Sequence, residues 1–399
     1  MKKLLLLGGL RYLIPVINAA KDLGHYVITC DYLPDNIAHI YSDEYHNISI
    51  VDKEAVLDLA KRLKIDGIMS FAVDPGVVTA AYVADKMGLP TPGPVRSVEI
   101  LQNKALFRQF LKEHNFNVPW AKSFRDMDKA LLHAKKYEFP VMVKPVDAAG
   151  SKGVSKVARW EELGEAIKYA LKFSNTKEFI MEEFLESKGF SSDCDCFSID
   201  GNLSFVSYSG QRFDRNSPNP YTPSAFSWPA SISKDNQSYL TNELQRLITL
   251  LGMKSSLYNV EVRETVNSKA YIMEVSPRGG GNRLAEMVRS MTGVDLIKRA
   301  VQAALGSRID PIRQVMFNEF WAEVILYSNK DGQFERLVID EKQEYLVKEI
   351  DLWVKPGDKI NGFSAANDSV GTLILKFGDR EQMNYILEDY SKFFKVKVI

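Results

Sequence analysis

The sequence predicts a multidomain protein of the α/β and α+β classes, with a doubly wound N-terminal domain and a small α/β unit at the C-terminus. Three observations support this prediction. The chain has 399 residues, which is more than one compact core accommodates, because cores stop growing near about 250–300 residues. Apolar runs alternate with helical periodicity through residues 1–88. The stretch "GLPTPGPV" at 88–95 carries three prolines and two glycines, a composition that indicates a linker.

The composition is ordinary for a globular protein and argues against several classes of function. Lys plus Arg and Asp plus Glu are each 51, and this balance argues against a nucleic-acid or anionic-membrane surface. Three cysteines give no disulfide framework. The apolar run at the N-terminus is too short for a signal peptide, and no run approaches the roughly 20 apolar residues of a membrane span. We therefore expect a cytoplasmic protein that acts on small molecules, with no nucleic-acid or membrane partner.

The first domain is predicted from alternating strands and helices. A strand at "KKLLLLGG" precedes a helix over 11–24, which ends at Gly24, and a second strand follows at 25–34. A helix over 54–65, a strand over 66–71 and a helix over 76–88 continue the pattern, which indicates a parallel doubly wound sheet. The turn "GGLRYL" lacks the glycine spacing of a dinucleotide site.

The remaining chain is predicted to be mixed α/β. In order, the expected elements are a helix over 97–116, strands over 118–124 and 139–145 with a helix over 126–139 between them, a helix over 161–173, a strand over 178–185, a hairpin over 195–210, a helix over 238–252, antiparallel strands within 255–278, a helix after the glycines at 279–281, and several strands with a late helix over 379–394. The segment 212–230 is rich in Pro, Ser and Asn, and we expect it to be a functional loop or lid.

The stretch "FPVMVKPVDAAGSKG" at 139–153 places Lys144 inside an apolar strand that runs into a loop of small residues. Such a loop exposes backbone N–H groups, which bind phosphate oxygens, and lysines add positive charge. Lys144, Ser151, Lys152 and Gly153 together suit a polyphosphate. The Walker pattern is absent and another strand is predicted to follow, so a hairpin flap is expected.

Two strands further along the chain each carry one acid. Glu261 lies in "YNVEVRE" and Glu274 in "YIMEVSPR". If these strands pair, the two acids can lie near each other, and a divalent cation relieves their repulsion and desolvation. Carboxylate oxygens suit Mg²⁺, which usually takes one or two protein carboxylates plus substrate phosphates. Arg278 and three glycines follow directly, a combination that suits an anion.

These features, taken in order, resemble the ATP-grasp superfamily, in its amino-acid ligase and carbamoyl-phosphate-synthase-like branch of carboxylate–amine ligases. The resemblance covers residues 1–308 and is carried by "NKALFRQF", "FPVMVKP", "AAGSKGV", the hinge "MEEFL", "VEVRE" and "MEVSPRGGG". It implies a pre-ATP-grasp domain over 1–95 and a two-lobed ATP-grasp domain over 96–308, with a small lobe at about 115–185 and a large lobe at about 186–308. The tail 309–399 looks like the C-terminal subdomain of the amino-acid ligase branch.

The resemblance also implies residue roles. The ATP-binding residues would be Lys104, Lys144, Gly150, Ser151, Lys152, Gly153, Glu182, Glu183, Phe184, Leu185 and Asp193, the last for the ribose. The metal ligands would be Glu261, Glu274 and Ser276. The catalytic residues would be Arg278 and Lys152, and Arg278 with Arg212 would bind the substrate. The family usually carries Asn where this chain has Ser276, so metal affinity is in question.

The implied cofactors are ATP and one or two Mg²⁺ ions, with Mn²⁺ as an alternative. The implied reaction joins a carboxylate to an amine through an acyl phosphate, and it releases ADP and phosphate. Two other functions stay open: an ATP-dependent carboxylase or carbamoyl-phosphate-type enzyme that uses bicarbonate, and a nucleotide-binding protein that has lost catalysis. A homodimer is one assembly that we consider.

Overall fold

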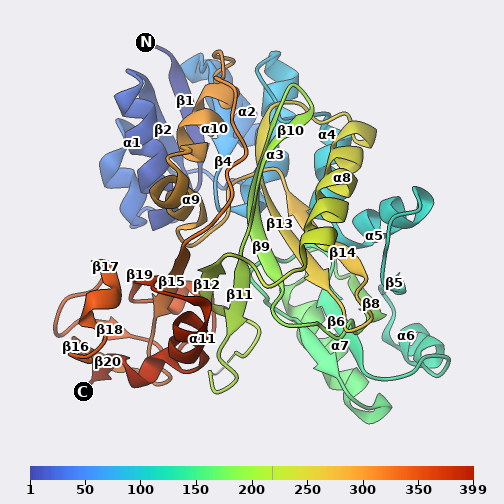
Figure 1. Ribbon diagram of the computed structural model, residues 1–399. Helices are drawn as coiled ribbons and strands as arrows, with labels where there is room; N and C mark the ends of the chain where they lie inside the picture. The colour runs from blue at the N-terminus through green and yellow to red at the C-terminus, as the bar shows by residue number, and fades with distance from the viewer. Residues whose placement is uncertain (218) are drawn as a thin grey trace.

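A computed structural model describes residues 1–217 and 219–399. Figure 1 shows the N-terminal domain and the C-terminal strands stacked on one side of the molecule, with the remaining sheets beside them. The mixed α/β and α+β fold class predicted from the sequence is confirmed by the five sheets and their covering helices. In the described part of the chain, no helix has both the length and the apolar character to cross a membrane.

The N-terminal domain contains a four-stranded parallel sheet in the order β3-β2-β1-β4. Its strands are β1 (Lys3–Leu7), β2 (Tyr26–Cys30), β3 (Glu44–His46) and β4 (Gly67–Ser70). Its helices are α1 (Ile14–Asp22), α2 (Lys53–Leu63) and α3 (Val77–Met87). Four consecutive leucines of β1 are fully buried, as expected for a parallel strand covered on both faces. The later helix α10 (Leu296–Ala304) packs against α1 and completes this core.

The helix predicted over 97–116 is in fact two helices, α4 (Val95–Gln102) and α5 (Lys104–Glu113). Asn103 between them has an extended backbone, with φ −119° and ψ 114°, and its side chain accepts hydrogen bonds from the N–H groups of Ala105 and Leu106. The prediction of one helix was wrong because an Asn that caps a new helix also ends the previous one. The break places Lys104 at the first position of α5.

The next sheet is antiparallel, in the order β5-β8-β6-β7. Its elements are β5 (Ala121–Phe124), α6 (Met127–Ala134), β6 (Val141–Pro145), β7 (Ser155–Val157), α7 (Leu163–Phe173) and β8 (Phe179–Glu183). Because β6 and β7 pair directly, the segment 146–154 is the hairpin loop that the sequence predicted. Gly150 and Gly153 in this loop have φ values of +66° and +72°, which glycine adopts without strain.

The largest helix covers one face of a third sheet, in the order β10-β9-β13-β14. The elements are β9 (Ser192–Ile199), β10 (Asn202–Tyr208), α8 (Lys234–Leu250), β13 (Ser256–Glu264) and β14 (Ala270–Ser276). The predicted hairpin turn at Asp200 and Gly201 is present. Cys194 and Cys196 project into the hydrophobic cluster on the α8 side. On the opposite face, Phe197, Phe205 and Leu257 join the core of the N-terminal domain, and the rest of this face, which carries Asp193 and Glu261, is polar.

The C-terminal strands combine with strands from the middle of the chain. The five-stranded sheet has the order β11-β12-β15-β19-β17. Its strands are β11 (Gly210–Phe213), β12 (Pro223–Trp228), β15 (Phe320–Leu326), β17 (Val347–Leu352) and β19 (Gly371–Phe377). A smaller sheet holds β16 (Gly332–Ile339), β18 (Lys359–Ile360) and β20 (Phe394–Val398), and α9 (Leu284–Thr292) and α11 (Arg380–Glu388) are the remaining helices.

Part of the loop predicted over 212–230 is strand. Positions 212–213 belong to β11 and 223–228 to β12; these strands pair with each other, and β12 pairs with β15 of the tail. A short strand that contains Pro and Ser gives little period-2 signal, so the partner of β12, more than ninety residues away, determines the structure. Residues 214–217 and 219–222 lie outside the strands, as the loop prediction expected, and residue 218 lies outside the described residues.

Asn103→Ala should destabilise the protein by about 1 kcal/mol, because it removes an N-terminal helix cap. Urea unfolding followed by circular dichroism would measure the change in the free energy of unfolding. Asn202→Ala, at an exposed position of the β9–β10 hairpin, is the matched control and should leave the free energy nearly unchanged. Equal stabilities of the two variants would contradict a capping role for Asn103.

Candidate active site

The polar face of the third sheet brings the two predicted acids together. Glu261 of β13 and Glu274 of β14 are direct partners in the antiparallel register, so their Cβ atoms lie about 4.5–5.5 Å apart on one face. Their side chains are 34% and 36% exposed. Glu261 contacts Arg263 Nη2 at 3.5 Å. The pair is therefore accessible and only partly neutralised by protein charges.

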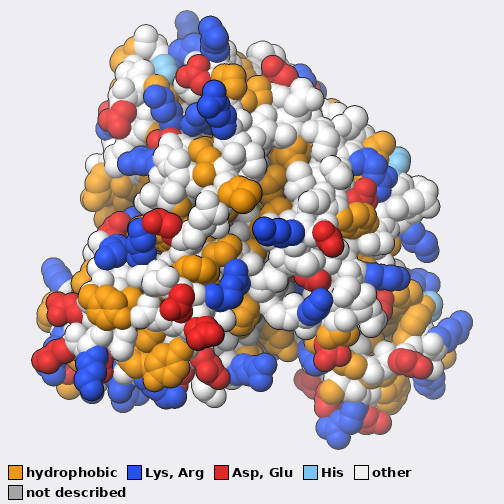
Figure 2. All heavy atoms as spheres, in the orientation of Figure 1, with side chains coloured by type: hydrophobic (Ala, Val, Ile, Leu, Met, Phe, Trp, Pro, Cys, Tyr) orange, Lys and Arg blue, Asp and Glu red, His pale blue; other side chains and the backbone are white. Residues whose placement is uncertain are grey.

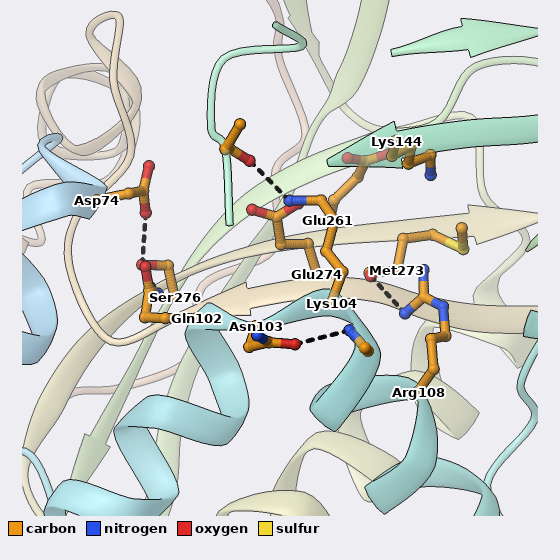
Figure 3. A network of polar contacts seen from close by, with 12 residues as sticks. Asp74, Gln102, Asn103, Lys104, Arg108, Lys144, Glu261, Met273, Glu274 and Ser276 are labelled. Carbon is orange, nitrogen blue, oxygen red and sulfur yellow. Dashed lines mark hydrogen bonds and ion pairs between the residues drawn. The ribbon is translucent and has the colours of Figure 1, made fainter. Parts of the chain in front are cut away.

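Lys104 reaches this pair from the N-terminus of α5, as Figure 3 shows. Its Nζ atom lies 3.3 Å from Glu274 Oε2 and donates a hydrogen bond to the backbone oxygen of Ala148 at 2.9 Å. Ala148 belongs to the β6–β7 loop. One lysine therefore connects the acid pair to the loop in which phosphate-binding residues were predicted.

Ser276, next along β14 on the same face, is 1% exposed. Its hydroxyl donates to Asp74 Oδ1 at 2.8 Å and accepts a hydrogen bond from Gln102 Nε2 at 2.8 Å. The predicted role of Ser276 as a metal ligand is disfavoured by these two hydrogen bonds and by its burial. Its observed contacts connect β14 to the N-terminal domain.

Arg278 makes a two-point ion pair with Asp74, which follows β4 of the N-terminal domain. Arg278 Nε donates to Asp74 Oδ1 at 2.8 Å and Nη2 donates to Oδ2 at 2.6 Å. Burial would lower the pKa of Arg278, but Asp74 outweighs it and the pKa is raised. Burial would likewise raise the pKa of Asp74, which Arg278 lowers. The guanidinium is thus permanently charged and held beside the acid pair.

Glu182 is the centre of a buried ion triad. It is 1% exposed; its carboxylate contacts Arg108 Nε at 3.0 Å and Lys144 Nζ. Burial would raise the pKa of Glu182, but the charges of Arg108 and Lys144 hold it at about 2. Arg108 also donates to the backbone oxygen of Met273 at 2.8 Å. Both carboxylate oxygens are engaged by these cations, which disfavours the ATP-binding role predicted for the Glu182 side chain.

The residues after Glu182 form an extended segment with a free outer surface. Glu183 is exposed and accepts from the Trp120 N–H at 3.3 Å. The ring of Phe184 lies 3.8 Å from Lys156 Nζ. Leu185 is 5% exposed, and its backbone oxygen accepts from Arg263 Nη1 at 3.3 Å. This arrangement retains an apolar surface and backbone groups, which could accommodate a planar base.

The β6–β7 loop carries the predicted flap residues. Ser151 Oγ donates to the backbone oxygen of Tyr221 at 3.0 Å, and this contact ties the loop to the β11–β12 connection. Lys152 is exposed. A Cβ at Gly153 would lie 3.0 Å from Phe173 Cδ2, so glycine is required there. The loop presents Lys152 and its backbone toward solvent beside Lys104.

Asp193 extends the acid row onto a third strand, because it is the register partner of Glu261 on β9. It accepts from Asn259 Nδ2 at 2.6 Å. Burial, followed by the charges of Asp195 and Glu261, raises the pKa of Asp193 to about 8. The ribose role predicted for Asp193 stays a prediction, since its observed neighbours on this face are other acids.

Arg212 is not brought to the acid pair. It alternates with Gln211 along β11 and therefore projects from the opposite face of the strand. Its Nη2 donates to Asn384 of α11 at 2.7 Å, and its guanidinium lies 4.2 Å from the centre of the Phe190 ring. Burial lowers the pKa of Arg212 to about 10. This position does not support the substrate contact that we had predicted for it.

Sequence reasoning missed Asp74, Gln102, Arg108 and Asp195. Asp74 had a usable signal, since it follows a parallel strand at its carboxyl end, where such sheets place functional groups. Arg108 also had one, because it stands four residues after Lys104 on the same helix face. Gln102 and Asp195 act through contacts between distant segments, and no local pattern identifies them.

The donor set suits a hard divalent cation bound together with a phosphate. Within residues 1–217 and 219–399, no group of three or more His, Cys, Asp and Glu side chains could hold a metal ion. Two half-exposed carboxylates on adjacent strands remain, and Mg²⁺ typically takes one or two protein carboxylates and completes its shell with substrate phosphates and water. The residues therefore fit such an ion.

Comparisons with known proteins agree with this geometry. Residues 137–286 match the family model for the ATP-grasp domain. A C-terminal section of the carbamoyl phosphate synthase large chain of Aquifex aeolicus is 24% identical over 307 residues, which are 76% of this chain and 56% of that protein. The chain spans still less of full-length large chains, for example 23% of the one from a Thermoanaerobacter species.

Solved structures share the fold over the whole chain. An L-amino acid ligase from Bacillus licheniformis has a TM-score of 0.80 at 21% identity and covers 100% of this chain and 99% of its own. A biotin carboxylase domain of 2-oxoglutarate carboxylase from Hydrogenobacter thermophilus, described in complex with MgADP and bicarbonate, has a TM-score of 0.75 at 17% identity, with 100% and 91% covered. The resemblance inferred from the sequence is thus confirmed at the level of the ATP-grasp domain.

Asp193→Asn should change how stability depends on pH when no divalent cation is present. The pKa of Asp193 is raised to about 8 in the fold, so the fold favours the protonated carboxyl. Its contribution to stability is complete below the pKa of Asp in the unfolded chain, near about 4, and is lost as pH rises toward 8. The Asn variant should therefore gain at least about 1 kcal/mol over wild type between pH 5 and 8. Urea unfolding in EDTA would measure this gain. Asp58→Asn, exposed on α2, is the control, and parallel pH profiles for Asp193→Asn and wild type would contradict the prediction.

Proposed function

Because residues 137–286 form an ATP-grasp domain, we propose that the protein is an ATP-dependent, ADP-forming carboxylate–amine ligase. The observation that supports this most is the direct register of Glu261 and Glu274 beside Lys104 and the β6–β7 loop. Acids for a divalent cation, a lysine for phosphate and a glycine-containing loop are required at one place for phosphoryl transfer from ATP.

In this proposal the nucleotide lies between the two lobes. Phe184 and Leu185 would contact the adenine ring, and backbone groups of this segment would bind its edge. Lys104, Lys144, Lys152 and the N–H groups of Gly150 to Gly153 would bind the phosphates. Glu261 and Glu274 would hold Mg²⁺, which when bound lowers the negative charge on the phosphates. These two acids suit a single Mg²⁺ ion, whose remaining ligands would include phosphate oxygens.

The reaction would proceed in two displacements. A carboxylate oxygen of the substrate bonds to the γ-phosphorus, and the bond from phosphorus to the ADP oxygen breaks. An amine nitrogen then bonds to the acyl carbon, loses a proton, and expels inorganic phosphate. Arg278, held by Asp74, would orient the carboxylate and offset charge on the transferring group. The β6–β7 loop would exclude water, which otherwise hydrolyses the acyl phosphate.

A second candidate is an ATP-dependent carboxylase or carbamoyl-phosphate-type enzyme that uses bicarbonate as the carboxylate. It is favoured by the similarity to a carbamoyl phosphate synthase section and by a solved neighbour described with bicarbonate. The two functions share the first displacement and differ in what attacks afterwards. A chain that binds ATP without turnover would be the third outcome.

Hydroxylamine trapping would test the proposal, because it converts an acyl phosphate into a coloured hydroxamate. The full chain, ATP and MgCl₂ would be incubated with each of the common L-amino acids, with short carboxylic acids and with bicarbonate, and ADP would be measured in parallel. Hydroxamate formed from an organic carboxylate supports the ligase. ADP release that depends only on bicarbonate supports the second candidate, and ATP binding without ADP release contradicts both.

Glu274→Gln should lower ADP release by at least about 100-fold, because it removes one charge from the cation site. The far-ultraviolet circular dichroism spectrum should be unchanged, and the MgCl₂ concentration for half-maximal ADP release should rise. Glu99→Gln, an exposed acid of α4 paired with Arg96, is the control. A near-normal rate in Glu274→Gln would remove this residue from the cation site.

A further inference from the structure

The polar face that carries the acid pair continues beyond it, across β9 and onto the five-stranded sheet. Asp195 pairs with Asn259 of β13 and with Ser207 of β10, and Gln211 pairs with Ser191 just before β9. Directly paired residues project from the same face. Asp193, Asp195 and Gln211 therefore face the same side as Glu261.

The same face runs across the second sheet. Gln211 of β11 is opposite Phe226 of β12, and Phe226 is opposite Glu323 of β15. Phe226 packs against Leu284 and Met287 of α9, so this face is covered by α9. Figure 1 shows α9 between the N-terminal domain and the C-terminal sheet. Glu323 thus lies on the same side as Gln211, with the apolar Phe226 between them.

Two buried atoms on this surface have no hydrogen-bond partner. Asp195 is 1% exposed; its Oδ1 accepts from the Gly280 N–H at 2.9 Å, whereas its Oδ2 is unpaired. Gln211 is 7% exposed, and its Oε1 is likewise unpaired. Burying an acceptor without a donor is costly. Both atoms require donors that the neighbouring side chains do not supply.

Glu323 also has few donors for its carboxylate oxygens. It is fully buried, and both of its carboxylate oxygens accept from one backbone N–H, that of Arg283. The Arg283 side chain is itself engaged by Glu286 and Glu349. Burial raises the pKa of Glu323 to about 8; Arg283 opposes the rise, and Glu286 and Asp193 add to it. Burial also raises the pKa of Asp195 to about 6.

The cover of this surface next to Asp195 is a loop of three glycines. A Cβ at Gly280 would lie 2.9 Å from Asp195 Oδ1 and 2.6 Å from Leu284 Cδ1, so the backbone approaches the acid closely. A Cβ at Gly281 would meet no atom within 4 Å. The loop therefore approaches Asp195 closely at Gly280 and leaves room for a side chain at Gly281.

We propose that Asp193, Asp195, Gln211 and Glu323 form the subsite for the attacking amine, and that it takes a primary ammonium group without a neighbouring carboxylate. The inference rests on the proposed function. Acceptor atoms that lack donors match the three N–H donors of an ammonium ion. Asp193 is the member of this subsite that pairs with Glu261, so the bound nitrogen is next to the carboxylate activated at Arg278.

The subsite has more acids than available arginines, and this excess determines which class of amine it can bind. Arg278 is assigned to the carboxylate that is activated, Arg283 is paired with Glu286 and Glu349, and Arg212 projects from the other face. An amino-acid acceptor would bring its own carboxylate close to Asp193 and Glu323, and none of these three arginines would be free to balance it. The structure thus favours alkyl amines, diamines and amide-blocked amines over free amino acids. The ammonium transfers one proton to a carboxylate before the neutral amine attacks.

Competition with hydroxylamine would test this subsite in the full chain. Hydroxylamine is uncharged at neutral pH, so it can trap the acyl phosphate without occupying an ammonium subsite. With a carboxylate that yields hydroxamate, glycinamide, putrescine and ethylamine would be compared with glycine and β-alanine. We expect at least one carboxylate-free amine to divert the acyl phosphate from hydroxamate, and the amino acids not to. Diversion by glycine as efficient as by glycinamide, or diversion by no amine, would overturn the proposal.

Two isosteric variants would locate the subsite. Asp195→Asn and Glu323→Gln keep an oxygen for the backbone N–H groups of Gly280 and Arg283 but remove the charge. Each should raise the KM for the diverting amine by about 10-fold or more, the usual effect of losing a charge-assisted hydrogen bond, while the rate of hydroxamate formation without amine stays the same. Glu319→Gln, an exposed acid just before β15 paired with Lys376, is the control. An unchanged KM, or equal losses in both reactions, would contradict the assignment.

Failure of the proposed function is distinguishable from failure of this subsite. Absence of hydroxamate with every carboxylate would count against the ligase. The subsite would then be judged by calorimetry of glycinamide and glycine binding to the protein in MgCl₂ and ADP. Glycinamide binding that glycine does not match and that Asp195→Asn weakens would support it, and equal binding of both compounds would overturn it.

Discussion

The arrangement of like charges on one face of an antiparallel sheet constrains the rest of the structure. The register of β9, β13 and β14 places Asp193, Glu261 and Glu274 in one row, and directly opposed like charges are destabilising. An apolar helix over this row of acids would bury their charges without partners. The fold covers the opposite face with α8 and meets this one with Lys104, with Arg278 and with a glycine loop. The position of the N-terminal domain brings Asp74, which holds Arg278, to this face. The break between α4 and α5 brings Lys104 to it.

Three cations at the site are each paired with an acid of the protein itself. Lys104 contacts Glu274, Lys144 contacts Glu182, and Arg278 contacts Asp74. Removing one partner of a partly buried pair leaves an uncompensated charge, which is strongly destabilising. An anion that attracted Lys104 alone would leave Glu274 unpaired. A polyphosphate that arrives with a divalent cation replaces both partners at once, so the geometry couples the two binding events.

Much of the fold could be predicted from the sequence where its signal is local. The parallel domain, the β6–β7 hairpin and the strands that hold Glu261 and Glu274 follow from period-2 or period-3.6 patterns and from turn residues. The predictions failed where a distant partner decides the outcome. Asn103 interrupts a continuous helical pattern because its side chain caps the next helix, and 223–228 form a strand because β15 supplies the pairing. In the sequence, Glu182 looks like an unpaired acid of the hinge, because no local pattern predicts that Arg108 and Lys144 bind it.

The tail is part of the central structure rather than an appendage, and the reason lies in the course of one segment. Residues 202–213 pair with β9 at one end and with β12 at the other, so this segment connects two sheets. Strand β12 in turn depends on β15, since Phe226 and Trp228 are buried only where α9 and the tail strands cover them. Without β15 the edge of β12 would expose unpaired backbone groups and both aromatic rings. This sheet places the acid Glu323 on the same side as Gln211, although the two residues are far apart in sequence.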